Sequence, residues 1–263
     1  MLSITDSFLH LKFLNMTTHT DWQYIQNQFL NALENSYKST NIFAKDHVSS
    51  LANFKTDTDI IALFNRTEPV YDAFQVKYTL WKKAVAFYKG STSVIDTLLL
   101  NYRVALVPRW DIKIQSEYMA STPEYLTLIP NGRTGMYTGG KDTQIQTIRT
   151  LAESLLEYSN LATLQTEVND YYVKIEKARD TQQQQEQTVQ DAADELRKAQ
   201  MAVCVMMYRN LGRLMDKYAE DTLFITKFYQ LNLIRNVASD SKTNETEVED
   251  IAPDMPNDLS TDE

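Results

Sequence analysis

The sequence predicts an all-α protein: an elongated helical bundle with two long antiparallel coiled-coil-like helices and shorter packing helices. Glycine and proline, which disfavour helices, number only 6 each in 263 residues. Most of them cluster in residues 108–140, and apolar residues recur at spacings of three and four on both sides of that cluster. This scarcity of turn residues argues against all-β sandwiches, Rossmann folds and barrels.

The clearest apolar pattern predicts one long helix over 160–211, within a stretch that contains no glycine or proline. A heptad-like series begins at Leu161 and ends at Met206. Two of its positions are the glutamines Gln182 and Gln185, inside the glutamine-rich stretch 181–187. Either the helix is continuous and these glutamines form a polar layer that fixes register, or the chain folds back there as a hairpin with a capping box. The uninterrupted heptad phase and the lack of turn residues favour the continuous helix.

A second series predicts a long helix over 69–107. Pro69 suits the first turn of this helix, and Pro108 is expected to end it. The two long helices have comparable lengths and flank one irregular segment, so we expect them to run antiparallel and bury each other. The members of this series are Val70, Phe74, Lys77, Trp81, Ala84, Tyr88, Ser91, Ile95, Leu98, Tyr102 and Ala105.

Shorter helices are expected around the two long ones. The spacing of apolar residues places them near residues 22–33, over 47–64 with a break near 56–58, over 142–158 with Asp142 as the N-cap, and over 222–237. The chain then divides into N-terminal helices (1–107), an irregular Gly/Pro-rich segment (108–141), C-terminal helices (142–237) and a tail (238–263).

The C-terminal tail holds nearly all of the net charge. Residues 238–263 contain nine acidic residues and one lysine, a net charge of −8, whereas the whole chain carries −9. This composition predicts disorder. The tail is then either a solvating segment or an acidic peptide that docks on a basic surface of a partner.

The N-terminal residues, the lengths of the apolar stretches and the net charge predict the compartment of the protein and the classes of partner that it binds. The N-terminus lacks a basic region, and Asp6 and His10 interrupt its apolar run, so no signal peptide is expected. No stretch approaches 18 apolar residues. We therefore expect a cytoplasmic protein. Export by a route that does not require an N-terminal signal is the alternative. The negative charge argues against nucleic acid and anionic membranes as partners, but this argument weakens for residues 1–237, whose net charge is only −1.

A phosphate-loop spacing occurs at residues 135–141, where Gly135, Gly140 and Lys141 match G-x-x-x-x-G-K. The next residue should be Ser or Thr, but it is Asp142, whose charge would repel a phosphate. A phosphate-binding loop also follows a β-strand, and before this loop only residues 125–129 resemble one. A tight crossover explains these glycines better, and nucleotide binding through 135–143 is a remote alternative.

No catalytic, metal-binding or cofactor-binding residues are predicted, and we expect a protein that is not an enzyme. The three histidines, at positions 10, 19 and 47, lack metal-ligand spacing and are expected at the surface or in caps. Cys204 lies in an apolar stretch and is expected to be a buried structural thiol.

The irregular segment 108–141 is the best candidate for a partner-binding surface, because loops on rigid scaffolds often carry function. The alternative is that Trp110, Ile112 and Ile114 pack back on the bundle and cap one end. The candidate partner-binding residues are Arg109, Trp110, Arg133, Tyr137 and Lys141.

We therefore expect a non-enzymatic structural or protein-interaction bundle. It would self-associate or join a larger assembly such as a phage or injection-machine particle, because its apolar seam exceeds what one partner helix covers. The expected partner is a protein or a second copy, with no nucleic acid and no small-molecule ligand. The alternative is a membrane-active long-helix protein that inserts residues 94–107 or 123–130.

Residues 108–235 also carry a pattern of short motifs. These are Trp110-Asp-Ile-Lys-Ile-Gln, Tyr118-Met-x-x-x-Pro-Glu-Tyr, Ile129-Pro-Asn-Gly-Arg and Phe228-Tyr-x-Leu-x-Leu-Ile. In this order, with a long Gln/Ala-rich helix before the last of them, the chain resembles uncharacterised bacterial proteins of the Bacteroidota type. The resemblance implies a bacterial origin and a long-helix architecture, and it implies no activity.

Overall fold

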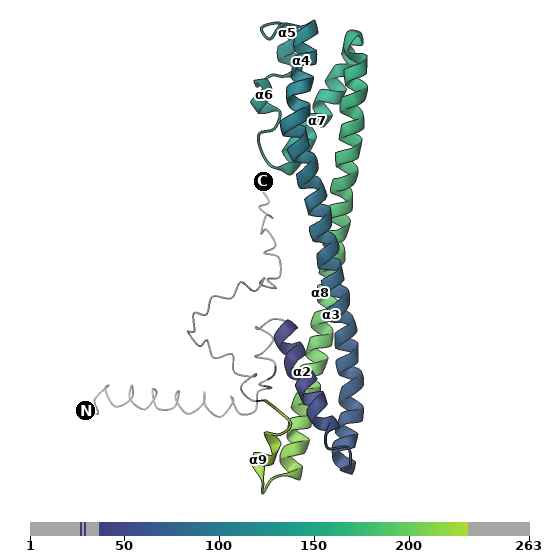
Figure 1. Ribbon diagram of the computed structural model, residues 1–263, viewed down its shortest axis with the longest axis vertical. Helices are drawn as coiled ribbons and strands as arrows, with labels where there is room; N and C mark the ends of the chain where they lie inside the picture. Colours follow the sequence, from purple (N-terminus) through teal and green to yellow (C-terminus); the bar gives the residue numbers. More distant parts are fainter. Residues whose placement is uncertain (1–26, 28, 30–36, 231–263) are drawn as a thin grey trace, which may run out of the picture. The chain divides into compact units, whose positions relative to one another are not determined.

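The computed structural model describes Asn27, Phe29 and residues 37–230. These residues form helices and contain no strand, so the all-α prediction is confirmed (Figure 1). They divide into two compact units. Unit 1 comprises the described chain up to Tyr78 together with the chain from Leu196 onward, and unit 2 comprises Thr79–Glu195. The boundaries that we expected at 107 and 141 are therefore not boundaries between compact units.

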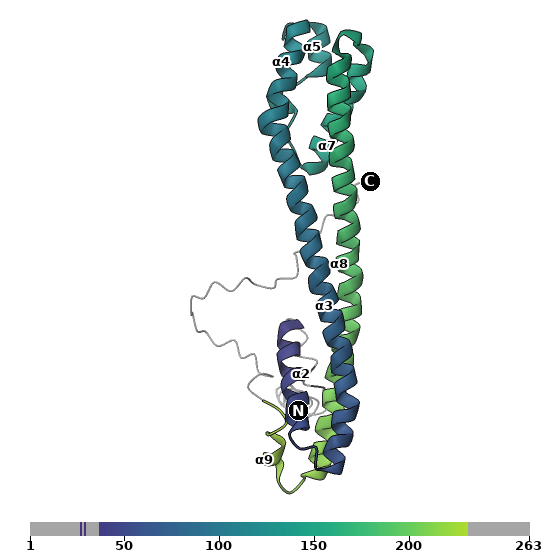
Figure 2. The same ribbon diagram turned by 45° about the vertical axis from the view of Figure 1, so that its right-hand side comes forward.

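Unit 1 contains α2 (Tyr37–Ala52), the first part of α3 (Thr58–Asn101), the last part of α8 (Ala162–Lys217) and α9 (Thr222–Ile225). Figures 1 and 2 show α2 lying along α3 and α8. Hydrogen bonds tie α2 to both: Gln200 Nε2 on α8 donates to Thr40 Oγ1 at 2.8 Å, and the Tyr71 hydroxyl on α3 donates to Asn41 Oδ1 at 3.3 Å. The break near 56–58 is confirmed, and Asp57 Oδ1 caps α3 by accepting from the backbone N–H of Asp59.

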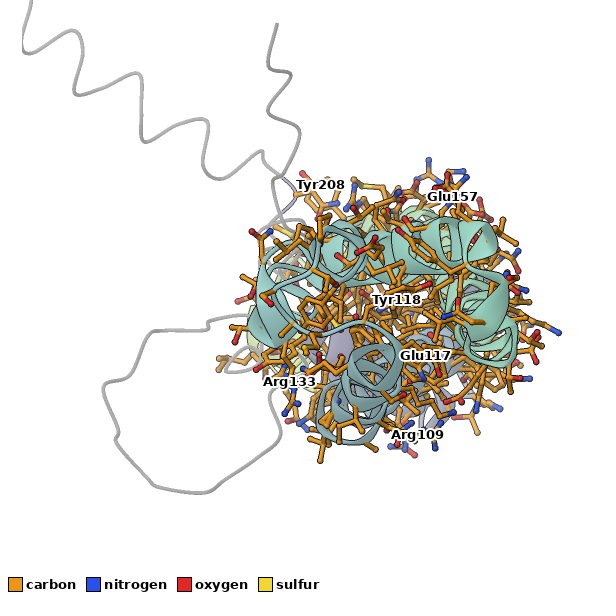
Figure 3. All side chains as sticks on the ribbon, turned by 90° about the horizontal axis from the view of Figure 1, so that it is seen from above. Arg109, Glu117, Tyr118, Arg133, Glu157 and Tyr208 are labelled. Carbon is orange, nitrogen blue, oxygen red and sulfur yellow. The ribbon has the colours of Figure 1, made fainter. Side chains whose placement is uncertain are left out.

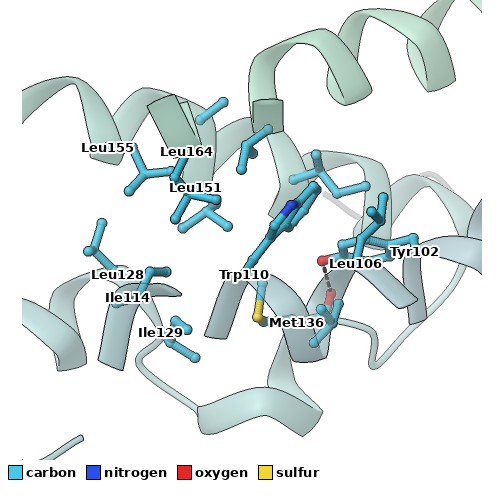
Figure 4. Close-up of a cluster of buried hydrophobic side chains, with 14 of the residues drawn as sticks. Tyr102, Leu106, Trp110, Ile114, Leu128, Ile129, Met136, Leu151, Leu155 and Leu164 are labelled. Atoms are coloured by element: carbon cyan, nitrogen blue, oxygen red, sulfur yellow. Dashed lines mark hydrogen bonds between the residues drawn. The ribbon is translucent and has the colours of Figure 1, made fainter. Parts of the chain in front are cut away.

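Unit 2 contains the rest of α3, a π-helical turn (Tyr102–Leu106), α4 (Val107–Glu117), α5 (Pro123–Leu128), α6 (Gly132–Gly135), α7 (Lys141–Ser154), two 3-10 turns (Leu155–Glu157, Ser159–Leu161) and the first part of α8. Trp110 lies at the centre of its core, among leucine and isoleucine side chains from α4, α5 and α7 (Figure 4). The Tyr102 hydroxyl donates to the backbone oxygen of Met136 at 2.8 Å and so fixes the segment after α6 to the π turn.

The predicted seam of the second long helix is confirmed. Every position of the series from Leu161 to Met206 is buried or half-buried, and α8 runs through residues 181–187 without a break, so the hairpin alternative is wrong. Gln182 is buried and donates from Nε2 to Thr92 Oγ1 of α3 at 2.7 Å. A buried amide needs such a partner, so this bond favours one register of α3 against α8. The helix ends at Lys217, six residues after the expected end at 211.

The first long helix begins earlier than expected. α3 starts at Thr58, so Pro69 lies inside the helix and not in its first turn. A proline removes the hydrogen bond to the carbonyl four residues earlier, here that of Asn65. Both Asn65 and Pro69 are exposed, so water can satisfy the freed carbonyl. The helix tolerates this proline because it faces solvent.

The prediction that Pro108 ends the helix is wrong, because a wide π turn precedes this proline. Val107 N–H bonds to the Tyr102 carbonyl, five residues back, and helix α4 continues to Glu117. The wider turn relieves the clash of the proline ring with the preceding turn. It also moves the buried positions by one residue, so that Leu106 is buried where the series predicts Ala105, and Trp110 is buried one turn later. The same shift leaves Ile112 63% exposed, although the alternative interpretation of this segment packs it on the bundle.

Three local predictions need correction. The N-cap of α7 is Gly140, and Asp142 lies in the first turn, where it pairs with Arg179 of α8. The segment 125–129, which resembles a strand, is mostly helical in α5. The helix expected over 142–158 ends at Ser154.

Three further predictions fall partly or wholly beyond the described residues. The helix expected over 222–237 is helical at Thr222–Ile225 and not over 226–230. Residues 231–237, the tail 238–263 and most of the expected helix at 22–33 lie outside the described residues. Phe29 from that N-terminal region is buried and stacks on Phe43, with ring centroids 5.6 Å apart.

We expect opposite effects from adding a methyl group at two glycines. Gly212 lies inside α8, and a Cβ there would have nothing within 4 Å, so Gly212→Ala should raise the free energy of unfolding by about 0.5–1 kcal/mol. Gly139 has φ +96°, and a Cβ there would lie 2.9 Å from Thr143 Cγ2, so Gly139→Ala should lower it by about 1–3 kcal/mol. Urea unfolding followed by circular dichroism measures both, and changes of the same sign would contradict the expectation.

Candidate functional site

Trp110, the central residue of the predicted partner-binding set, is part of the core of unit 2. Its side chain has no exposed surface, and Ile114 one turn later is also fully buried. Only the indole N–H reaches a polar group: it donates to Glu167 Oε1 of α8 at 2.7 Å. The structure therefore agrees with the alternative in which Trp110 and Ile114 pack back on the bundle.

The carboxylate of Glu167 accepts hydrogen bonds from three side chains of α4. Besides Trp110, Lys113 Nζ lies 2.8 Å from Glu167 Oε2, and the Arg109 guanidinium pairs with Oε1. Burial raises the pKa of Glu167, but the bonds from Lys113, Trp110 and Arg109 outweigh this and lower it to about 2. Figure 3 shows Arg109 at the periphery of the structure. The predicted residue Arg109 thus helps to hold α4 on α8.

Arg133 contacts a second carboxylate within unit 2, that of the buried residue Asp111. Its Nε and one terminal nitrogen donate to Asp111 Oδ2 at 2.9 and 2.5 Å, while the Tyr125 hydroxyl donates to Asp111 Oδ1 at 2.7 Å. The Asp111 side chain is 2% exposed, and burial raises its pKa; the bonds from Tyr125, Arg133 and Gln115 more than offset this and lower the pKa below its ordinary value. A charged buried carboxylate with these donors ties α4, α5 and α6 together.

The remaining two predicted residues also have partners within the chain. Lys141 Nζ lies 2.6 Å from Asp96 Oδ1 of α3, and the Tyr137 ring lies 5.8 Å from the guanidinium carbon of Arg103. Lys141 therefore neutralises a carboxylate, which differs from the phosphate-binding role of a P-loop lysine. The five predicted residues come from one unit, but four of them contact three separate carboxylates and the fifth, Tyr137, contacts an arginine.

A surface that sequence reasoning missed is a row of apolar side chains on α3 in unit 2. Leu80, Phe87 and Val94 are 50%, 57% and 53% exposed and follow one another at intervals of seven residues. They are distinct from the buried seam of the same helix, which includes Trp81 and Ile95. A search for a second heptad series beside the seam would have found this row, because side chains seven residues apart share one helix face.

A buried polar network in unit 1 was also missed. His47 is fully buried, in contrast to the surface or capping position that we expected. Its Nδ1 lies 2.9 Å from the Phe228 carbonyl oxygen, so this nitrogen donates, and Nε2 lies 3.0 Å from Asn210 Nδ2. Asn210 in turn donates to Thr67 Oγ1 at 2.7 Å. Burial lowers the pKa of His47 to about 4, so the ring is neutral near pH 7.

The Tyr229 ring covers this network. It stacks on the His47 ring with centroids 4.3 Å apart, and its hydroxyl donates to the Met207 carbonyl at 2.8 Å. The chain after α9 is therefore fixed to α2 and α8 by a histidine, a tyrosine and two backbone carbonyls. The residues of this network come from four distant stretches of sequence, so no local motif reveals it.

Cys204 is buried, and burial raises its pKa to about 11, so it is a structural thiol as predicted. Among the described residues, no three His, Cys, Asp or Glu side chains are grouped so that they could hold a metal ion. Nor does this part of the chain contain a helix that is long and apolar enough to cross a membrane.

Comparisons of this chain with protein-family models, with curated proteins and with solved structures find no match.

Proposed function

We propose that this protein acts by binding another protein chain along the exposed row of α3, and that its first partner is a second copy of itself. The observation that carries the proposal is the row Leu80, Phe87 and Val94, in which each side chain is about half exposed. Three large apolar side chains at heptad spacing form a stripe that a second helix can cover.

The row is symmetric about its middle residue, which favours a second copy over an unrelated chain. In an antiparallel pair of α3 helices related by a twofold axis at Phe87, the two Phe87 rings meet and each Leu80 faces a Val94. An isologous interface requires this kind of self-complementarity. Lys83 then faces Ser91 of the other copy and Lys89 faces Val85, so the pairing places no like charges opposite each other.

The surrounding charges support binding at this face. Lys83 Nζ lies 5.7 Å from the centre of the Phe87 ring, where its stem can lie against the ring without covering the row. Asp96, the acidic residue nearest to Val94, already pairs with Lys141. No uncompensated carboxylate at this end of the row therefore needs to be dehydrated when a partner helix arrives.

Burial of six half-exposed side chains contributes about 4–9 kcal/mol, from which an association cost of at least about 4 kcal/mol is subtracted. At the favourable end about 5 kcal/mol remains, so we expect a dissociation constant of about 0.1–0.3 mM for a pair held by this row alone. Such a pair is weak by itself, and it suits an assembly in which many copies are held close together.

Sedimentation velocity over about 1–300 µM tests this proposal. The wild-type chain should shift from monomer to dimer with rising concentration, and Phe87→Glu should weaken the dimer at least tenfold because two carboxylates would meet at the twofold axis. Val173→Glu is the matched control, since Val173 is 53% exposed and lies on α8, outside the row. A wild-type monomer at every concentration, or equal weakening by both variants, would contradict the proposal.

A further inference from the structure

Unit 1 contains a groove lined by three arginines. It has a volume of about 490 Å³ and lies between α3 and α8. Leu63 and Met206 provide an apolar floor, and Asn210, Gly212 and Asp216 complete the lining. The arginines are Arg66, Arg209 and Arg213.

The positive charge of this groove is not neutralised within the described part of the chain. Arg66, Arg209 and Arg213 are exposed and form no ion pair or hydrogen bond there. Other basic groups of unit 1 are engaged: Lys217, for example, contacts Asp57 and Asp59. Against three guanidinium groups the groove itself offers one carboxylate, that of Asp216, so it is built to attract an anion with an apolar part.

The sequence supplies a segment of this chemistry in the same chain. Residues 245–251 read Glu-Thr-Glu-Val-Glu-Asp-Ile and contain four carboxylates with two apolar side chains among them. They lie in the acidic stretch 238–263, outside the described residues. Guanidinium groups bind carboxylates bidentately, and Val248 and Ile251 match the floor formed by Leu63 and Met206.

We infer that the acidic segment 245–251 binds in the Arg66/Arg209/Arg213 groove of its own chain. The connection is long enough: the fifteen steps from Gln230 to Glu245 can span up to about 50 Å. The chain also starts close to the groove, because the Tyr229 hydroxyl bonds to the carbonyl of Met207, the residue after Met206. Tethering at this distance gives an effective concentration in the millimolar range, which compensates for a weak contact.

Paramagnetic broadening in the full-length chain tests this contact. A nitroxide is attached to Thr243→Cys, next to the segment, and the methionine methyl groups are labelled with ¹³C. At low salt the Met206 signal should lose at least half of its intensity relative to the reduced nitroxide, while Met136 in the core of unit 2 serves as the reference. Cys204 is fully buried and should not take up the label, which the chain without the added cysteine verifies.

Two variants and one control identify the groups involved. Arg66→Gln/Arg209→Gln/Arg213→Gln should restore the Met206 signal, as should Glu245→Gln/Glu247→Gln/Glu249→Gln/Asp250→Asn, which leaves the helices unchanged. Removal of three exposed cations elsewhere, by Lys89→Gln/Lys174→Gln/Lys177→Gln, should preserve the broadening. Sodium chloride at 0.5 M should reduce it, because salt screens exposed charges.

Three outcomes would overturn the inference. The first is an unbroadened Met206 signal in the wild-type background at low salt. The second is broadening that persists in both the arginine and the carboxylate variants. The third is broadening that appears only when nitroxide-labelled and ¹³C-labelled chains are mixed, which would place the segment on another copy. None of these outcomes depends on the α3 row. The experiment therefore tests binding of segment 245–251 to the groove separately from self-association.

Discussion

Replacement of Trp110 by alanine is expected to lower the free energy of unfolding by about 3–5 kcal/mol, the largest effect of any single substitution in unit 2. The indole is fully buried, and Tyr102 and Tyr171 pack against it with ring centroids 5.7 and 5.9 Å away. Alanine would leave a cavity and remove the N–H bond to Glu167. Urea unfolding followed by circular dichroism measures the loss.

Trp110→Phe separates packing from hydrogen bonding. Phenylalanine keeps most of the apolar volume but cannot donate to Glu167, so we expect a smaller loss of about 1–2 kcal/mol. Arg109 and Lys113 still pair with the Glu167 carboxylate in this variant. A loss below about 1 kcal/mol for Trp110→Ala would show that this tryptophan is not the centre of the core.

Acid should destabilise unit 1 through His47, by about 3 kcal/mol between pH 6.5 and pH 4. The pKa of His47 is lowered from 6.5 to about 4 in the folded chain because burial disfavours the charged ring. The unfolded chain therefore takes up a proton first as the pH falls. This contribution to stability is fully present above pH 6.5, declines as the pH falls from 6.5 to 4, and falls no further below the folded pKa.

Two measurements check this acid sensitivity. The ring signals of His47 in NMR spectra should titrate near pH 4, and the free energy of unfolding should fall with pH in the stated window. His47→Asn keeps a donor for the Phe228 carbonyl but has no titratable ring, so its stability should depend less on pH between 6.5 and 4. A ring that titrates near 6.5 in the folded protein would contradict the buried position.

In unit 2, the loss of folding stability at acidic pH comes from the carboxylates Asp111 and Glu167 and not from a histidine. The pKa values of Asp111 and Glu167 are lowered in the folded state, so their contributions are present above the ordinary carboxyl pKa and are lost as the pH falls below it. Loss of stability that begins near pH 6 therefore points to His47, whereas loss that begins near pH 4 points to the two carboxylates.

Periodicity predicted the long helices well because it reports which face of a helix is buried. The series in α8 was correct at every position, including Gln182, since its polar layer leaves the heptad phase unchanged. The clustering of glycine and proline placed the connection between the two long helices only roughly, because the helical path continues past Pro108 to Glu117. Local sequence alone was enough for the series in α8, because it depends on residues that are close in sequence.

The candidate site was harder to predict because it depends on contacts between distant residues. The five predicted residues were chosen as charged and aromatic side chains in a Gly/Pro-rich segment. Their partners Glu167 and Asp96 come from helices α8 and α3, so only the folded chain shows that the charges are already used. His47 was assigned to the surface for the same reason: its partners lie 163 and 181 residues away.

The π turn makes the number of residues between Tyr102 and Trp110 as important as their identity. A regular α-helical turn in its place would rotate all of α4 by about one residue, or roughly 100°. Arg109 would then point toward the core and Trp110 toward water. A related chain with one residue fewer in this stretch would therefore be expected to carry its aromatic residue one position earlier, and an alignment that ignores the length difference would pair a core tryptophan with a surface residue.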